Sequence, residues 1–312
     1  MRRWFFALGC AACSAVPPVQ EPTARQQPRF DADALLADTA ALLEVPRVLG
    51  SDDRAQGLNV LTHRLTQGGA TVVVQPFTGF DPLDGRTMPL ANLFGVVRPE
   101  APRQFVLATH FDVRPWAESD PDPTRRDQPI PGANDGTSGV VVLLALLPRL
   151  VDALPSDVGF TIVLFDGEEL GRPEHGGYCA GSTHFAAHPQ DAPPSILRAS
   201  FGIVLDMVGD AELNIAKEAH STTQNPALVE AIWRTAASLG ERSFIDATYP
   251  HAILDDHVLL SRAGIPSVLL IDYDYDAWHT HADALDRVCG ESMASVARVV
   301  FETVLAAMPG SG

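Results

Sequence analysis

Two adjacent carboxylates, Glu168 and Glu169, directly follow an apolar and β-branched run from Phe160 to Phe165, which predicts a buried strand. Gly167 breaks this run, so both side chains are expected where the strand leaves the sheet, the usual ligand crevice of open α/β sheets. Because neighbouring carboxylates repel each other, such a pair usually needs a cation or two separate tasks. One can bind a metal ion while the other transfers protons. An isolated Glu-Glu pair is more often a solvated acidic turn.

Other segments also carry side chains that bind metals or transfer protons. They are 109–112, 132–136 and 205–209, each next to a predicted strand or helix, and 255–257 and 278–281, both expected in loops. Each segment alone is more often a turn, a helix cap or an ordinary histidine. Their occurrence at successive strand ends is harder to explain in that way. Carboxylate and imidazole ligands suit zinc or a similar cation.

The pattern of expected helices and strands around these residues predicts an α/β fold. Strands alternate with helices from residue 105 onward, which predicts a single three-layer α/β/α sandwich with a mixed, mostly parallel central sheet. Two helices and several strands come first, which predicts an antiparallel portion of the sheet. The expected helices cover 30–45, the stretch between the cap residues 51–53 and Gly68, the apolar run after Gly136, 226–239 and 291–308. The expected strands cover 70–77, 91–97, 105–109, 160–165, 201–205 and 267–271.

The composition narrows the choice of partners. A chain of 312 residues, 46% of them hydrophobic, can bury a sizeable core. Its formal net charge of −17 argues against nucleic acid or an anionic membrane face as a partner. Beyond the N-terminal segment the cysteines are Cys179 and Cys289, which either form one disulfide or remain two thiols.

The N-terminal segment predicts export from the cytoplasm. Arg2 and Arg3 precede a short apolar run, so residues 1–14 are expected to form a signal peptide. It is either of the ordinary type or of the lipoprotein type, with membrane attachment through a lipidated Cys10. Residues 15–29 are rich in proline and glutamine and predict a tether, and 30–312 are expected to form the catalytic domain. The folded part would then be periplasmic, attached to the outer membrane as a lipoprotein, or secreted.

The segments with candidate ligands also carry a resemblance. From about residue 91 to residue 304 the chain resembles the zinc aminopeptidase superfamily, and within it the animal-type glutaminyl cyclases and their bacterial relatives. The matching segments are 110–123 (HFDVRPWAESDPDP), 131–140 (PGANDGTSGV), 165–169 (FDGEE), 179–182 (CAGS), 201–209 (FGIVLDMVG), 255–257 (DDH) and 278–280 (WHT). The metal-site segments are shared across the superfamily, whereas 114–117 (RPWA), 255–257 and 278–280 point to the cyclases.

The resemblance implies a zinc site. Asp135, Glu169 and His279 would hold the zinc ion, and the fourth position would remain open for water or substrate, as a catalytic zinc requires. Glu168 would be the proton shuttle.

The resemblance also implies a substrate pocket. Asp255 and Asp206 would form hydrogen bonds near the scissile group, and Trp278 would be one wall. Animal cyclases have another tryptophan shortly after the glutamate pair, where this chain has 172–175 (RPEH). Tyr178 or Tyr275 is expected to supply that aromatic wall instead.

The implied reaction converts the N-terminal glutamine of a peptide or protein into pyroglutamate and releases ammonia. Zinc would polarise the γ-carbonyl, and Glu168 would carry the proton of the attacking amine to the leaving ammonia. The alternative is a two-zinc aminopeptidase, in which His110 and Asp206 bind the second zinc and Glu168 activates a bridging water. A third possibility is an inactive protein that only binds partners. It predicts lost ligands, and none of the residues expected to bind zinc is missing.

Overall fold

A six-stranded sheet lies at the centre of the computed structural model, which describes residues 29–310. Its strands are β1 (Thr71–Phe80), β2 (Thr87–Val97), β3 (Arg103–His110), β4 (Val158–Phe165), β5 (Ala199–Asp206) and β8 (Ser267–Ile271), in the order β1-β2-β4-β3-β5-β8. The pairs β4–β3, β3–β5 and β5–β8 are parallel, and β1–β2 and β2–β4 are antiparallel. The predicted mixed sheet with an antiparallel portion is therefore confirmed.

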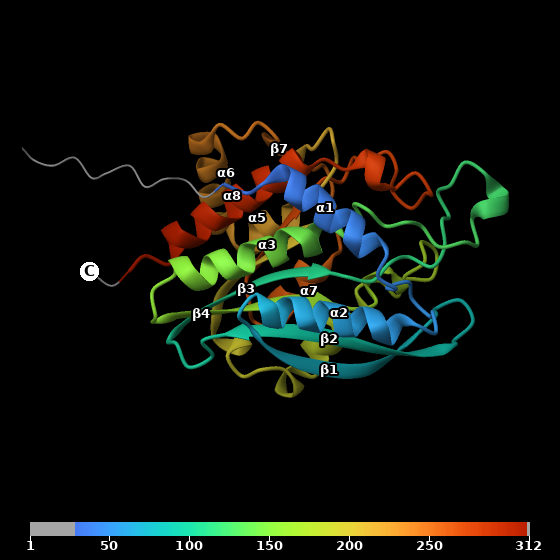
Figure 1. Cartoon of the computed structure of the whole chain (residues 1–312), viewed down its shortest axis with the longest axis horizontal. Coiled ribbons are helices and arrows are strands. Elements are labelled where there is room, and N and C mark those ends of the chain that lie inside the picture. The colour runs from blue at the N-terminus through green and yellow to red at the C-terminus, as the bar shows by residue number, and fades with distance from the viewer. Residues whose placement is uncertain (1–28, 311–312) are drawn as a thin grey trace, which may run out of the picture.

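Helices cover both faces of this sheet (Figure 1). One face packs against α1 (Ala32–Leu43), α2 (Arg54–Gln67), α3 (Ser138–Ala153), α6 (Pro226–Leu239) and α8 (Gly290–Ala307). The other face packs against α4 (Ala180–Ala187) and α7 (Asp256–Arg262), while α5 (Ala219–Gln224) lies beside β8. A small parallel pair, β6 (Ile215–Lys217) and β7 (Phe244–Thr248), lies outside the main sheet. Five single-turn 3₁₀ helices complete the described part: η1 (Pro123–Arg125), η2 (Glu168–Leu170), η3 (Pro189–Asp191), η4 (Ile196–Arg198) and η5 (Leu285–Arg287).

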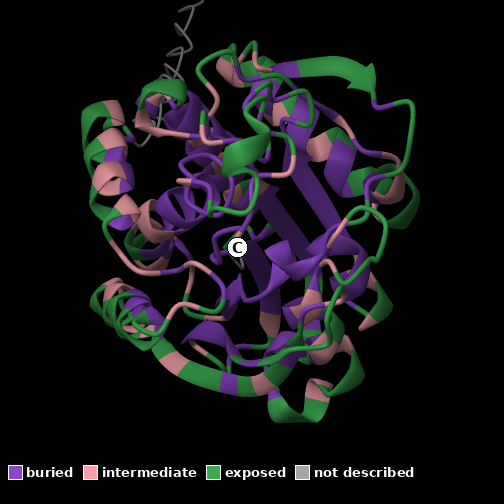
Figure 2. Cartoon of the chain, turned by 90° about the vertical axis from the view of Figure 1, so that its right-hand side faces the viewer, coloured by how far each residue is buried: buried purple, intermediate pink, exposed green. Residues whose placement is uncertain are grey.

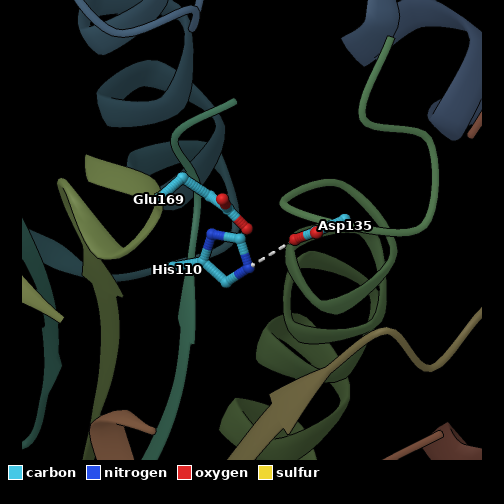
Figure 3. Close-up of side chains that lie close together, drawn as sticks. All are labelled: His110, Asp135 and Glu169. Carbon is cyan, nitrogen blue, oxygen red and sulfur yellow. Dashed lines mark ion pairs between the residues drawn. The ribbon is translucent and has the colours of Figure 1, made fainter. Parts of the chain in front are cut away.

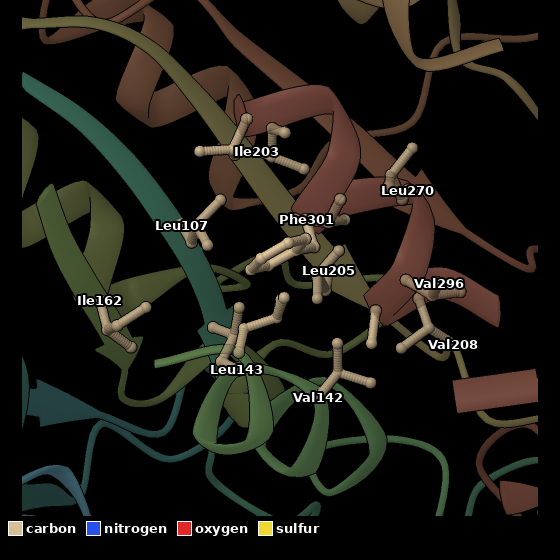
Figure 4. Close-up of a cluster of buried hydrophobic side chains, with 14 of the residues drawn as sticks. Leu107, Val142, Leu143, Ile162, Ile203, Leu205, Val208, Leu270, Val296 and Phe301 are labelled. Atoms are coloured by element: carbon tan, nitrogen blue, oxygen red, sulfur yellow. The ribbon is translucent and has the colours of Figure 1, made fainter. Parts of the chain in front are cut away.

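The main core lies between α3, α8 and the sheet. All eight residues of β4 are buried because a strand in the middle of a sheet with helices on both sides has two packed faces. In Figure 4, Leu143 of α3 lies among Leu107 of β3, Leu205 of β5 and Phe301 of α8. Burying each such side chain contributes about 1.5–3 kcal/mol. Figure 2 shows this buried interior, with exposed residues on the outer faces of the surrounding helices.

The predicted helices and strands are present, with ends within a few residues of those expected. The bounds of α6 and β8 are the predicted ones. Pro46 follows α1, and Gly68 ends α2, but the side chain of Asp53 makes no cap hydrogen bond. The short elements α4, α5, α7, β6 and β7 were not predicted, because each is too short to show a clear hydrophobic period.

One predicted loop is wrong. Residues 255–257 begin a helix, with Asp255 as the N-cap residue of α7. The Asp255 carboxylate accepts a hydrogen bond from the backbone N–H of Asp256, the first residue of the helix, whereas a capping side chain more often reaches the second or third. The same residue type serves as a cap and as a site residue, so the sequence alone does not separate the two roles.

The predicted signal peptide, Cys10 and the predicted tether up to residue 28 lie outside the described residues. Within residues 29–310, no helix has the length and apolarity needed to cross a bilayer. Cys179 and Cys289 are both free thiols.

Candidate metal and acid–base site

The site lies where the parallel strands end. His110 is the last residue of β3, Asp206 is the last residue of β5, and Glu168 and Glu169 form η2 directly after β4. Asp135 lies in the loop before α3, and His279 follows β8. Because parallel strands end at the same edge of the sheet, residues far apart in the sequence meet there.

His279 lies close to two of the carboxylates, and His110, Asp135 and Glu169 also have ligand atoms within 4.8 Å of one another. His279 Nε2 lies 3.4 Å from Glu169 Oε2 and 3.7 Å from Asp135 Oδ2. Ligand atoms about 2.1 Å from a tetrahedral zinc are about 3.4 Å apart, so the spacing fits. Both Asp135 oxygens are buried and form no hydrogen bond within residues 29–310. A buried carboxylate without hydrogen bonds is unfavourable, and a cation would satisfy it. The donor set therefore fits a zinc ion.

A second histidine, His110, faces the other carboxylate oxygen of Asp135. His110 Nε2 is 3.2 Å from Asp135 Oδ1 and 3.1 Å from Asp206 Oδ1 (Figure 3 shows His110, Asp135 and Glu169). Burial opposes protonation of His110, but Asp206, Asp112 and Asp135 outweigh it and raise its pKa well above the usual value. Asp135 thus has one oxygen near each of two histidines, which is the placement of a carboxylate that could bridge two metal ions.

Two charged residues fix the orientation of the proposed ligands. Glu118 accepts a hydrogen bond from His279 Nδ1 at 2.7 Å, so the Nε2 atom is left to face Glu169 and Asp135. Arg114 donates to Glu169 Oε2 at 2.6 Å and from its Nε to Glu118 Oε2 at 2.8 Å. Burial opposes ionisation of Glu118, but the hydrogen bonds from His279 and Arg114 prevail and lower its pKa to about 2.

The two glutamates have opposite electrostatic environments. Burial raises the pKa of Glu168 well above its usual value, and the neighbouring charge of Glu169 adds to the effect. Burial acts on Glu169 too, but the charges of His279 and Arg114 outweigh it and hold the Glu169 pKa well below its usual value. Environments that separate two carboxyl pKa values assign separate tasks to them. Glu169 is kept ionised for a metal, and Glu168 can hold and release a proton.

Two buried carboxylates hold the backbone of the site in place. Asp112 accepts hydrogen bonds from the backbone N–H groups of Glu168 at 3.2 Å and Glu169 at 2.9 Å. Asp283 does the same for the N–H groups of Asn134 at 2.8 Å and Asp135 at 3.2 Å.

Left-handed backbone is concentrated at the site. Within residues 29–310, four residues other than glycine have a positive φ, and three of them are Cys179, Met207 and His279, next to or within the site. This conformation is unfavourable for such residues and persists only where the surroundings impose it, which is common at functional sites.

The site opens into a cavity of about 300 Å³. Asp135, Glu168, Glu169, Asp206, Asp255 and His279 line it. Its aromatic walls are Trp278, Tyr178 and Tyr273. Trp278 is 39% exposed, and its ring stacks on that of His279 with centroids 3.6 Å apart. The expected wall residues Trp278 and Tyr178 are thus at the cavity.

The expectation for Tyr275 is not met. Tyr275 does not line the cavity, because its side chain is only 5% exposed and its hydroxyl donates to Asp283 Oδ1 at 2.8 Å. Tyr273 lines the cavity instead, with 41% exposure. Residues 273 and 274 form a turn after β8, so Tyr273 and Tyr275 do not share one face as residues two apart in a strand would, and the sequence does not show where this turn begins.

Sequence reasoning also missed the residues that orient the ligands. Arg114, Glu118, Asp112 and Asp283 had no assigned role. The first three lie within the segment 110–123, which resembles the glutaminyl cyclases. That resemblance was the one feature of the sequence that could have pointed to them. Asp283 follows His279 by four residues and had no motif of its own.

Comparisons with known proteins identify a family and related structures. The family model for peptidase family M28 matches residues 92–304. The crystal structure of Bacteroides thetaiotaomicron glutaminyl cyclase bound to N-acetylhistamine superposes with a TM-score of 0.83 and 31% sequence identity, covering 89% of this chain and 99% of that chain.

Two further relatives have lower sequence identity to this chain than that structure has. Bovine glutaminyl-peptide cyclotransferase is 27% identical over 242 residues, which cover 67% of this chain and 64% of the bovine protein. An aminopeptidase of Bacillus subtilis is 24% identical over 227 residues, which cover 70% of this chain and 44% of that protein. The chain thus matches less than two thirds of the length of either relative.

Proposed function

The chain belongs to peptidase family M28, and from this membership and the site geometry we propose that it is a zinc-dependent glutaminyl-peptide cyclotransferase. Its substrate would be a peptide or protein with an N-terminal glutamine, and its products pyroglutamate and ammonia. The likeness to the Bacteroides thetaiotaomicron glutaminyl cyclase over 89% of the chain supports the proposal.

One observation carries the proposal: Glu168, with a raised pKa, lies beside the candidate zinc ligands in a small cavity with aromatic walls. A carboxyl group whose pKa is raised can both take and return a proton in the same reaction. The cavity of about 300 Å³ suits one folded side chain better than an extended peptide. Both features are what an intramolecular attack on a glutamine side chain requires.

Asp135, Glu169 and His279 would hold the zinc ion, which when bound supplies Lewis-acid polarisation of the γ-carbonyl. In the reaction, the α-amine nitrogen of the substrate bonds to its γ-carbon, and the bond from that carbon to the amide nitrogen breaks. Glu168 takes the proton of the amine and passes it to the amide nitrogen, which leaves as ammonia.

The remaining cavity residues would position the substrate. Asp255 and Asp206 would accept hydrogen bonds from the amine, since both line the cavity next to Glu168. Trp278 and Tyr178 would press the glutamine side chain into the folded conformation in which amine and carbonyl are close. A cavity filled in this way also excludes water, which favours cyclisation over hydrolysis.

A second candidate function is supported by the position of Asp135 between two histidines. In a two-zinc aminopeptidase, His110 and Asp206 would bind the second ion and Asp135 would lie between both. One relative of this chain, from Bacillus subtilis, is an aminopeptidase. Glu168 would then activate a water molecule.

Incubation of the full chain with a Gln-initiated and a Leu-initiated peptide, followed by mass spectrometry, separates the two functions. Loss of about 17 Da from the Gln peptide alone, the mass of the ammonia released in the proposed amine attack, supports the cyclotransferase. Release of free leucine without that loss contradicts it and supports the aminopeptidase.

We also propose that the catalytic domain, residues 30–312, acts outside the cytoplasm. The segment 1–14 has the pattern of a signal peptide, and Cys10 has the position of a lipidated cysteine. Fractionation of cells that express the wild-type chain and C10A tests this. Recovery of the wild-type chain in the cytoplasm contradicts export, and an unchanged membrane fraction for C10A contradicts lipidation.

A further inference from the structure

A free thiol contacts the proposed proton shuttle. Cys179 Sγ donates a hydrogen bond to Glu168 Oε1 across 3.2 Å, and both side chains are buried. Within residues 29–310, no other group donates a hydrogen bond to the Glu168 carboxyl. The thiol therefore determines which Glu168 oxygen is held and which remains free.

The backbone ties the same two residues together. The Cys179 N–H donates to the Glu168 carbonyl oxygen at 3.1 Å, and the Ala180 N–H donates to the Gly167 carbonyl oxygen at 3.1 Å. Through these bonds the start of α4 is fixed against η2. The thiol thus reaches the carboxyl from a backbone that cannot shift independently of Glu168.

The conformation of Cys179 makes the residue type informative. Its φ of 57° lies in the left-handed region, where glycine is favoured and any other residue costs about 1 kcal/mol or more. Two side-chain contacts that glycine could not make can offset this strain. The thiol packs against Val258 and Leu259, and it donates the hydrogen bond to Glu168.

We propose that Cys179 is a positioning residue for Glu168, which holds one carboxyl oxygen in place so that the other faces the substrate. The inference rests on the proposed role of Glu168 as proton shuttle. Burial and the nearby Glu168 charge raise the pKa of Cys179 well above its usual value, so the thiol keeps its proton and remains a donor. Asp255 and Asp256 also approach the thiol, each with an oxygen within 4.8 Å of it. A neutral donor can hold Glu168 here without adding a charge to this acidic cluster.

Four single variants test the proposal through kcat and KM on the Gln-initiated peptide. C179A removes the donor and is expected to lower kcat about ten-fold with little change in KM, the effect of one lost hydrogen bond. C179S restores a donor and is expected to recover most of that loss. C179G relieves the left-handed backbone but has no donor, so kcat falls as in C179A without a lower Tm than C179A. C289A, which changes the other described cysteine at the N-terminus of α8, is the control with wild-type kcat.

Zinc content and Tm are measured on every variant. Wild-type kcat in C179A and C179G overturns the proposal. So does a fall in kcat that C179S does not recover, or one that accompanies loss of zinc, because the thiol would then have only a structural role. If the wild-type chain releases leucine and forms no pyroglutamate, the proposed function fails. The kcat of each Cys179 variant relative to the wild type is then measured on the Leu peptide, because Glu168 would also transfer the proton in that reaction.

An infrared measurement tests the hydrogen bond without any turnover. The difference spectrum of wild type minus C179A isolates the S–H stretching band of Cys179. The same difference is then recorded in a Glu168→Ala background. A shift of the band to higher frequency on loss of the carboxyl is expected, and an unchanged band overturns the proposal.

Discussion

Glu118 accepts a hydrogen bond from Nδ1 of His279 across 2.7 Å, although 161 residues separate them in the sequence. Since the pKa of Glu118 is lowered to about 2, its carboxylate is ionised and can only accept, so the proton lies on Nδ1. In the neutral imidazole, the form that can bind a metal ion, the lone pair of Nε2 is then directed toward Glu169 and Asp135. One contact thus sets both the tautomer and the direction of the proposed ligand.

The first prediction concerns this contact. E118A is expected to weaken zinc binding about 10- to 100-fold, because the imidazole loses the group that fixes its tautomer and direction. Competition with a chelator of known zinc affinity measures the change. E174Q, on the exposed loop near the cavity, is the control that should bind zinc like the wild type. Equal zinc affinity in E118A and wild type would show that Glu118 does not orient the ligand.

The second prediction separates proton transfer from metal binding. E168Q preserves the shape of the side chain but cannot take a proton, so kcat is expected to fall by about 10² to 10⁴. Its zinc content should match that of the wild type, because Glu169 and not Glu168 faces His279. Near-normal turnover of the Gln peptide by E168Q would contradict the assignment of the shuttle.

The third prediction counts the metal ions. H279A is expected to lose zinc and activity, whereas H110A is expected to keep one zinc ion and most of the cyclisation. The reason is that His279 contacts both Glu169 and Asp135, while His110 pairs with Asp206 and faces the other oxygen of Asp135. Elemental analysis of the purified variants gives the stoichiometry. Two zinc ions per wild-type chain, with one lost in H110A, would favour the aminopeptidase.

The fourth prediction concerns stability and pH at Glu218, the N-cap residue of α5. Its carboxylate accepts the N–H groups of His220 and Ile253, and its other oxygen lies 3.0 Å from Nε2 of His257. Burial would raise the Glu218 pKa, but the hydrogen bonds prevail and lower it from 4.5 to about 2. A depressed pKa contributes stability that is complete above the unfolded-state value and is lost as the pH falls through the folded-state value.

E218Q is therefore expected to lower the free energy of unfolding by about 2 kcal/mol at neutral pH, the contribution of hydrogen bonds to a charged group. The difference from the wild type should shrink as the pH falls from 4.5 toward about 2. Urea unfolding across this pH range measures it. E230Q, which breaks only an exposed pair with Lys217, is the matched control with little effect. A pH-independent difference would show that the charge of Glu218 does not stabilise the fold.

The hydrophobic patterns were sufficient to predict the layers of this fold. The run from Phe160 to Phe165 is fully buried in β4, and the apolar run after Gly136 is α3, because burial on both faces leaves a continuous apolar signal. Short elements were missed for the opposite reason. The eight residues of α4 include mostly small or polar side chains, so its position depends on contacts with η2 and α7 and not on a local pattern.

At the site, the sequence indicated the candidate ligands but not the residues that contact and orient them. Asp135, Glu169 and His279 stood out because metal-ligand types followed predicted strands or lay in matching segments. The residues that orient them, such as Arg114 and Glu118, act across long sequence separations, and no local pattern marks such a contact. Tyr273 is exposed and Tyr275 is buried because a turn follows β8, and no hydrophobic pattern marks that turn in the sequence.

The three proposed zinc ligands come from the loop before α3, the turn after β4 and the segment after β8. No two neighbouring elements of the chain contain all of them. A newly synthesised polypeptide therefore gains its affinity for the metal only when β8 has joined β5 at the edge of the sheet. With the proposed ligands, zinc binding would be coupled to the completion of the sheet, and bound zinc would stabilise the sheet against reopening at that edge.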